Sequence, residues 1–188
     1  NPIRLTYMSY SPKVKMYLCI LLLPFLSFLT TNLTGRFVGG YGSNFIAPVS
    51  ILTTLFLSFF AFYESFIAMS CCTVSLFSWF TTDLFVCDWA FLFDSITVVM
   101  LLVVTGVSSL VHIYSTEYMA NDPHRARFLG YLSLFTFFML VLVTADNFII
   151  MFLGWEGIGL ASFLLISFWF NRIKTGKAAI KAMIVNRV

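Results

Sequence analysis

Uncharged apolar stretches alternate with short polar ones along this chain. Asp, Glu, Lys and Arg are all absent from five stretches, which are 16–35, 37–63, 65–82, 95–116 and 128–145. Each stretch approaches or exceeds the roughly 18 to 20 residues with which a helix crosses about 30 Å of hydrocarbon. The pattern predicts an all-α polytopic membrane protein with about six transmembrane helices.

The polar interruptions set the expected limits of these helices. The run 128–170 is too long for one crossing and breaks at Thr144–Asn147, so we expect two antiparallel helices joined by a tight turn. The polar stretch 31–43, which contains four glycines, closes the first span in the same way. The expected helices are 16–31, 44–63, 95–116, 128–144, 147–170 and 177–188.

The uncharged run 65–82 differs from the others. It is rich in Ser, Thr and Cys, and it partly alternates between polar and apolar residues from Thr73 to Leu76. Such alternation is typical of a half-buried strand. We therefore expect a short strand or hairpin in the loop between the second and third spans, with a seventh helix as the alternative.

Residues 1–15 precede the first expected span and are interpreted as an N-terminal extension. Their basic residues ahead of an apolar run imitate a signal peptide, but no small-residue cleavage site follows. Loops on the cytoplasmic or matrix side collect Lys and Arg. With the N-terminus outside, the outer side holds only Arg4, Lys13 and Lys15, whereas the inner side holds Arg36, Arg125, Arg127, Arg172, Lys174 and Lys177. The sequence therefore predicts that the N-terminus is outside.

Composition narrows the possible functions. The chain is 60% hydrophobic and 10% charged, and its net charge of +3 is not gathered into a basic block, so no nucleic-acid partner is expected. The four cysteines (Cys19, Cys71, Cys72 and Cys87) have neither zinc-site spacing nor a disulfide framework, so we interpret them as small apolar fillers. Phosphate-binding glycine loops and paired nucleophiles and bases are also missing. We expect no cofactor and no metal in this chain.

One acidic residue lies where a membrane helix should be apolar. Glu156, in the stretch FLGWEGIGL, is the tenth of 24 residues in the expected helix 147–170, which places it near the middle of the bilayer. A carboxylate there is costly and marks a proton-relay candidate. Gly154, Gly157 and Gly159 around it permit close helix contact or leave room for water. The alternative is a neutral or ion-paired Glu156 that only holds helices together.

Three basic or titratable residues are weaker candidates. Arg187 lies deep in the expected sixth helix, where a basic group needs an acidic partner, so an ion-pair or relay role is expected. Lys181 in the same helix either takes part in the relay or extends to the membrane surface. His112, near the inner end of the helix 95–116, either exchanges protons or is an ordinary interfacial histidine. Asp122 and His124 belong to a turn in a solvated loop.

Several stretches resemble a known family. They are Trp89–Ser95, Ser108–Ser115, Asp122–Phe128, Thr144–Leu165 and Lys177–Val188. In these stretches the chain is similar to the fifth, NuoL-like membrane subunit of respiratory complex I, NADH:ubiquinone oxidoreductase, and most of all to mitochondrial sequences of plants and protists. The resemblance implies the N-terminal part of an antiporter-like fold that is shared with Mrp cation/proton antiporters.

The resemblance also implies roles for single residues. Glu156 matches a glutamate that works with a lysine on the family's seventh helix, and Arg187 matches an arginine beside an aspartate. Both of those partners follow the last residue of this sequence in the family. We therefore expect the N-terminal piece of a split subunit, completed by a C-terminal fragment as a separate chain, and a truncated subunit is the competing explanation.

The function implied by the resemblance is proton translocation coupled to NADH:ubiquinone electron transfer in the mitochondrial inner membrane, with the N-terminus toward the intermembrane space. NADH, FMN, iron–sulfur clusters and ubiquinone are expected in other chains of the complex. Expected partners are the other membrane subunits, such as the fourth-subunit neighbour, and lipids such as cardiolipin. The alternatives are an Mrp-type Na+/H+ antiporter subunit and a scaffold fragment without active proton transfer.

Overall fold

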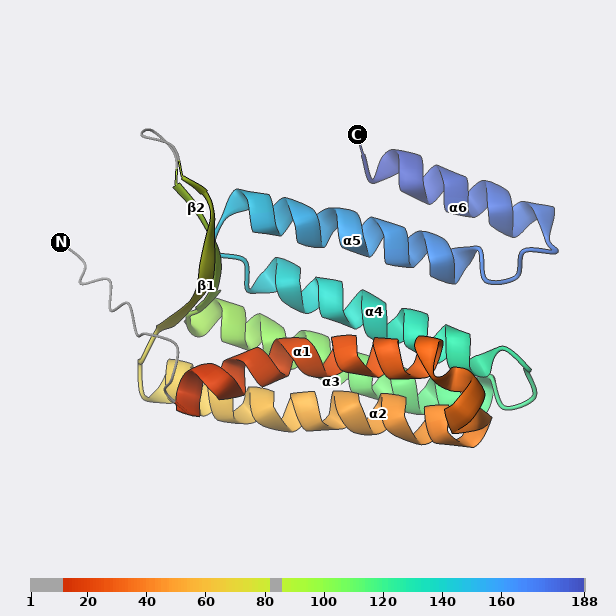
Figure 1. Ribbon diagram of the computed structural model, residues 1–188, viewed down its shortest axis with the longest axis horizontal. Helices are drawn as coiled ribbons and strands as arrows, with labels where there is room; N and C mark the ends of the chain where they lie inside the picture. The colour runs from red at the N-terminus through yellow and green to blue at the C-terminus, as the bar shows by residue number, and fades with distance from the viewer. Residues whose placement is uncertain (1–11, 82–85, 188) are drawn as a thin grey trace.

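The described part of the chain is a stack of long helices with a β-hairpin across one end. The structure, a computed structural model, describes residues 12–81 and 86–187 (Figure 1). Its elements are α1 (Pro12–Leu33), α2 (Gly35–Phe62), the π-helical turn η1 (Tyr63–Ile67), β1 (Cys72–Thr81), β2 (Val86–Phe93), α3 (Ser95–Tyr118), α4 (Arg125–Val143), α5 (Phe148–Ile166) and α6 (Ile173–Val185).

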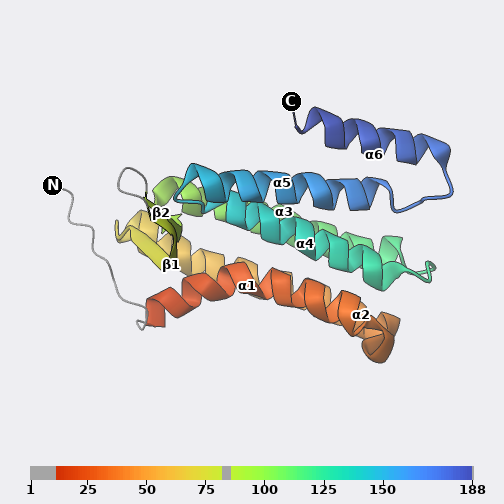
Figure 2. The same cartoon turned by 45° about the horizontal axis from the view of Figure 1, so that its top comes forward.

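The helix α4 is the centre of the stack. The helices α1, α2 and α3 all pack against α4, and α5 packs on another side of it. The helix α6 packs only on α5 among the substantial helix pairs of the described residues, so it lies at the edge of the stack (Figure 2). The α5 segment around Glu156 therefore packs mainly against α4 and α6.

Within the part of the chain that the structure describes, five helices are long and apolar enough to cross a membrane. The spans are Val14–Leu33, Gly39–Ile67, Ser95–Tyr118, Arg125–Val143 and Phe148–Ile166. The predicted all-α membrane fold with a strand element between the second and third spans is thus confirmed. The sixth helix differs from the expectation, because α6 has 13 described residues, begins at Ile173 and is not among these spans.

The start of the chain differs in two places from the expected limits. The helix α1 begins at Pro12, so residues 12–15 of the expected extension are helical, whereas residues 1–11 lie outside the described residues. The helix α2 begins at Gly35 instead of 44, so the expected polar link at 31–43 is wrong. Gly39 interrupts α2 at φ 69°, a conformation that glycine adopts without strain, and the helix continues after it.

The hairpin of β1 and β2 confirms the strand predicted in the run 65–82. The two strands pair antiparallel, with Cys72 opposite Phe93 and Val74 opposite Phe91. On one face Trp89 lies 5.8 Å from Phe77 and 5.3 Å from Trp79, measured between ring centroids. Aromatic cross-strand pairs of this kind stabilise a two-stranded sheet, which is only marginally stable by itself.

The strand β2 is also bonded to the turn between α4 and α5. The backbone N–H of Leu92 donates to the Thr144 carbonyl at 2.8 Å, and that of Asp146 donates to the Ala90 carbonyl at 3.3 Å. The Asn147 side chain donates from Nδ2 to the Asp88 carbonyl at 2.6 Å. The predicted break at Thr144–Asn147 is thus confirmed, and its freed backbone groups are satisfied by the hairpin. We call this side of the molecule the hairpin end.

The largest apolar core lies beside the hairpin end. Tyr17 of α1 stacks on Phe93 at 4.4 Å between ring centroids and donates its hydroxyl to Glu64 Oε2 at 3.0 Å. The Asp94 side chain caps α3 by accepting from the Thr97 backbone N–H at 2.9 Å, and Thr97 Oγ1 accepts from the Asp94 backbone N–H at 2.9 Å. The hairpin, the caps and the core together fix where α5 begins.

Candidate functional site

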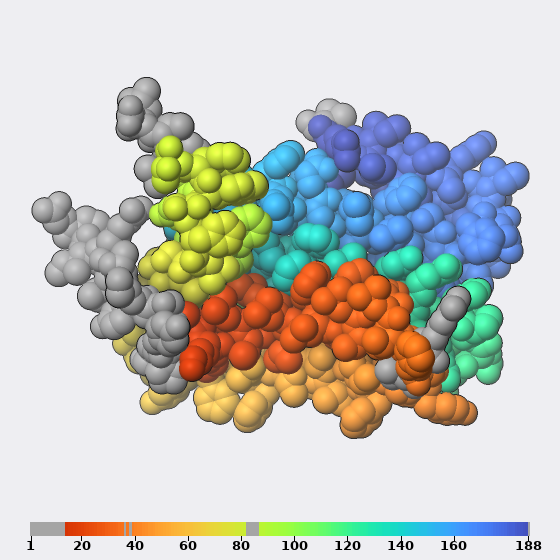
Figure 3. Space-filling view, viewed as in Figure 1, coloured from red at the N-terminus to blue at the C-terminus, as the bar shows by residue number. Residues whose placement is uncertain are grey.

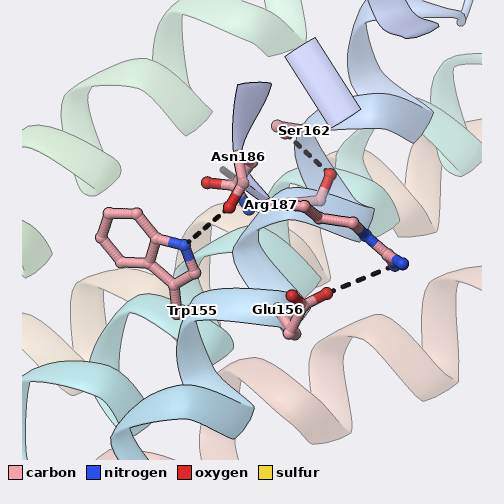
Figure 4. Close-up of polar contacts among 6 residues, drawn as sticks. Trp155, Glu156, Ser162, Asn186 and Arg187 are labelled. Carbon is pink, nitrogen blue, oxygen red and sulfur yellow. Dashed lines mark hydrogen bonds and ion pairs between the residues drawn. The ribbon is translucent and has the colours of Figure 1, made fainter. Parts of the chain in front are cut away.

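Glu156 lies at the middle of α5, the ninth of its 19 residues. Its side chain is 31% exposed in the described chain and points toward the end of α6. There Arg187 Nη2 lies 3.4 Å from Glu156 Oε2, and the Arg187 side chain is 59% exposed (Figure 4). The carboxylate and the guanidinium are 31 residues apart in sequence, and the reversal of the chain between α5 and α6 brings them together.

The end of α6 is held on α5 by a second contact. Trp155 Nε1 donates to the backbone carbonyl of Asn186 at 3.1 Å (Figure 4). The Asn186 side chain fills the space in which a Cβ on Gly159 would lie. A side chain at position 159 would therefore require the Asn186 side chain to move. Glycine at this position lets the end of α6 lie close to α5.

Glycines on α5 also let α4 approach closely. A Cβ on Gly154 would lie 2.8 Å from the backbone of Leu142, and one on Gly157 would overlap the ring of Phe138. Contacts this short do not occur for real Cβ atoms, so Gly154 lets the backbone of α4 approach directly and Gly157 makes room for the ring of Phe138. The carboxylate is thus carried by a helix packed tightly against α4.

A pocket of about 380 Å³ surrounds the ion pair. Besides Glu156 and Arg187, its walls are mostly apolar, from Phe138, Leu153, Leu160 and Met183. The volume is large enough for several water molecules, each of which occupies about 30 Å³ in the liquid. A carboxylate with one cationic neighbour, mostly apolar walls and room for water can accept a proton and release it.

His112 is fully buried between α1, α3 and α4, with 0% of its surface exposed. Its Nδ1 lies 2.8 Å from the Ser108 carbonyl, and its Nε2 lies 3.3 Å from Ser133 Oγ. Ser133 is 3.3 Å from Ser27 Oγ, and Ser108 is 2.7 Å from Thr136 Oγ1. Of the two alternatives for His112, the ordinary interfacial histidine does not fit its full burial, because these hydroxyl groups give the imidazole partners inside the bundle.

Two protein families match separate stretches of this chain, and one of the two stretches contains Glu156 and Arg187. The family described as the N-terminus of chain 5 of NADH-ubiquinone oxidoreductase (complex I) matches residues 79–129. The family described as the transmembrane part of NADH:quinone oxidoreductase/Mrp antiporters matches residues 145–188, which include Glu156 and Arg187. The chain belongs to the complex I chain 5 family.

Named relatives agree with this assignment to chain 5. Proteins named NADH-ubiquinone oxidoreductase chain 5 from Chondrus crispus and Arabidopsis thaliana are each 54% identical over 173 residues. One from Phytophthora infestans is 49% identical over the same length. Each match covers 92% of this chain and 26% of the relative. The chain therefore spans about a quarter of the length of the chain 5 relatives that it matches.

The other residues that the sequence suggested as functional lie outside the Glu156–Arg187 pocket. Lys181 is exposed on α6 and has no ion pair among the described residues. Asp122 accepts from the His124 backbone N–H at 2.9 Å, the turn expected for this loop. Cys19, Cys71 and Cys87 are free thiols. Within residues 12–81 and 86–187, no group of three or more His, Cys, Asp or Glu side chains could hold a metal ion.

Sequence reasoning missed two features of this chain 5 site. It did not name Glu156 as the partner of Arg187, because that contact depends on how the link 167–172 reverses the chain. It also missed the hydroxyl groups around His112. Their signal was available in the four-residue spacing of Ser108 and His112 and in the three-residue spacing of Ser133 and Thr136, which place each pair on one helix face.

We expect His112→Leu to destabilise the bundle by about 1 to 3 kcal/mol, because it removes the two hydrogen-bond contacts of the buried imidazole with Ser108 and Ser133. The Ser108 carbonyl also belongs to the backbone hydrogen bonding of α3 and loses only its second bond, the one to the imidazole. Most of the lost stability therefore comes from the contact with Ser133. Thermal unfolding of the purified assembly measures the change. Leu110→Ala, at a side chain 69% exposed on the same helix, is the control and should have a smaller effect. Equal shifts would contradict a structural contribution of the imidazole.

Proposed function

We propose that this chain forms part of a proton-translocating membrane subunit of mitochondrial respiratory complex I, in which Glu156 carries the proton. The observation that carries the proposal is the Glu156–Arg187 ion pair at the middle of a membrane-length helix, within a largely apolar pocket. If the residue at this position served only to pack helices, an apolar side chain would do so at a lower free-energy cost than a carboxylate. Membership of the chain 5 family supports the same assignment.

The charge of Arg187 gives the pocket a way to load and release a proton. With the guanidinium 3.4 Å away, the deprotonated carboxylate is stabilised by an opposite charge. In this proposal, movement of the guanidinium toward and away from the carboxylate accompanies release and uptake of the proton. The exposed position of Arg187 at the end of a short edge helix suits such movement.

Other parts of the proposed subunit complete the site. The chain spans about a quarter of its relatives' length, and the pocket is partly open. We propose that the rest of the subunit packs over this opening, with other membrane subunits as neighbours. NADH, FMN, iron–sulfur clusters and ubiquinone belong in this proposal to other chains.

The charges at the two ends of the stack support an orientation. We call the end with the links α3–α4 (residues 119–124) and α5–α6 (residues 167–172) the loop end. Basic residues gather there, and acidic residues gather at the hairpin end. We propose that the loop end faces the mitochondrial matrix and the N-terminus faces the intermembrane space, following the positive-inside rule. The loop end holds Arg125, Arg127, Arg172, Lys174 and Lys177 with the acids Glu117 and Asp122, and the hairpin end holds Glu64, Asp88, Asp94 and Asp146 with Lys13 and Lys15 of α1.

Purification of the assembly from gently solubilised membranes tests the proposal. We expect the chain to migrate with NADH-oxidising, quinone-reducing activity. Migration with other antiporter chains and without NADH oxidation would instead identify an Mrp-type Na+/H+ antiporter and refute the proposal.

A further inference from the structure

A second pocket, of about 310 Å³, lies at the loop end and takes no part in the proposed proton transfer. It is formed by the α3–α4 link, the first turn of α4 and the α5–α6 link, which adjoin at one end of the molecule (Figure 3). The residues that matter for its chemistry are Asp122, His124, Arg127, Phe168, Trp169 and Arg172. We call it the loop-end pocket.

The loop-end pocket carries excess positive charge. Arg127 and Arg172 both line it, and in the residues that the structure describes neither of them has a carboxylate within ion-pair distance. Asp122 is the one acid in the lining, and it already accepts a hydrogen bond from the His124 backbone. Two arginines line this one cavity, and a guanidinium presents paired N–H donors that match the oxygens of a phosphate.

Arg127 is fixed in place and has an unused donor. Its Nε is buried and has no hydrogen-bond partner among residues 12–81 and 86–187. Its guanidinium lies over the ring of Phe168, 5.2 Å from the ring centroid, and Phe168 itself is 6% exposed. Cation–π stacking fixes the plane of the group. A buried donor is costly to leave unpaired, so an oxygen-rich anion is the complement this pocket lacks.

The pocket lies where membrane helices leave the bilayer. The helix α3 ends at Tyr118, α4 begins at Arg125 and α5 ends at Ile166, and all three belong to candidate spans. Trp169 is 47% exposed on the pocket wall, as is typical of aromatic residues at the membrane surface. Basic pockets between membrane helices at this level favour anionic lipid headgroups.

An apolar groove provides space for an acyl chain. It has a volume of about 440 Å³ and lies between α3 and α4, with Val107, Leu132 and Leu165 among its walls. Leu132 follows Arg127 by five residues, about 7.5 Å along the helix, and Leu165 precedes Phe168 by three residues, about 4.5 Å. The groove thus begins just below the loop-end pocket on the membrane side.

We propose that the loop-end pocket binds the phosphate of an anionic phospholipid, with an acyl chain along the groove between α3 and α4. Arg127 and Arg172 hold the phosphate oxygens, and Trp169 lies at the glycerol level. A soluble phosphate would use the same arginines but not the groove. This site does not rest on the proposed proton transfer and would stand if that proposal failed.

Photolabelling of the purified assembly tests this site. The probe is a phosphatidylglycerol with a diazirine in its acyl chain, and mass spectrometry maps the labelled peptides. We expect labels on α3, α4 and the end of α5, and we expect cardiolipin to displace the probe at concentrations at least about tenfold below those of phosphatidylcholine. Equal displacement by both lipids would refute an anion site, and displacement by inorganic phosphate at similar concentration would refute a lipid.

Matched charge variants locate the binding. Arg127→Gln with Arg172→Gln should weaken labelling at least about tenfold, because two charge-assisted contacts are lost. Lys174→Gln with Lys177→Gln removes the same charge at the same end from residues outside the pocket and should leave labelling unchanged. Equal losses in both pairs would show diffuse surface attraction and overturn the site. If the arginine pair fails to assemble, the lipid competition on the unaltered protein still decides.

Discussion

The substitution Glu156→Gln is expected to abolish proton translocation through this subunit while the assembly forms in normal amount. Glutamine keeps the shape of the side chain, and its amide oxygen can still accept from Arg187, but it cannot take up or release a proton at physiological pH. A positioned acid–base group typically contributes a factor of about 100 or more to proton transfer. The rate through this pocket should therefore fall to background.

Proton uptake into vesicles that contain the purified assembly, driven by NADH and a quinone, measures the effect of Glu156→Gln. The ratio of protons moved to electrons transferred should fall, because other proton paths in the assembly remain. Glu117→Gln is the matched control, since it makes the same change at an exposed position near the end of α3, outside the pocket. An unchanged ratio in a fully assembled Glu156→Gln protein would show that the carboxylate is structural.

Gly154→Leu is expected to prevent α4 and α5 from packing and to lower the amount of assembly several-fold. The new Cβ would lie 2.8 Å from both Cα and N of Leu142, which are backbone atoms that no rotamer change can move aside. Overpacking of this kind costs about 1 to 3 kcal/mol, and losses of that size change the amount of protein in a cell several-fold. The turn at 144–147 is bonded to β2, so α5 cannot slide to relieve the contact.

The amount of assembled complex in membranes and its thermal midpoint measure the effect of Gly154→Leu. Gly106→Leu on α3 is the control, because no other side chain or distant backbone atom lies within 4 Å of the position a Cβ would take there. The two substitutions add the same side chain to a membrane helix and differ in the space that receives it. Equal amounts of both variants would mean that the close contact between α4 and α5 is not needed for folding.

The apolar pattern predicted the membrane helices well because the bilayer imposes a minimum length on each crossing. It also predicted the break at Thr144–Asn147, where polar residues interrupt a run too long for one span. The limits of α2 were wrong for a physical reason. A glycine-rich polar stretch indicates a loop, but here Gly39 takes a positive φ and the chain on both sides of it stays helical.

The candidate site was predicted in part. The position of Glu156 in its helix follows from the sequence alone, because the length of the apolar run fixes its depth. The Arg187 contact and the burial of His112 depend on how separate helices pack, and helix spacing alone does not determine that. The loop-end pocket was missed for the same reason, since Arg127 and Arg172 are 45 residues apart in the chain.

The bonds between β2 and the α4–α5 turn have a mechanical consequence. The strand β2 is bonded along one edge to β1, which follows α2, and along the other to the residues that open α5. Asn147 precedes Glu156 by nine residues, about 13 Å along the helix. Any force that tilts the hairpin would therefore move the start of α5 with it, and a rigid α5 would carry the displacement from the hairpin end to the Glu156 carboxylate.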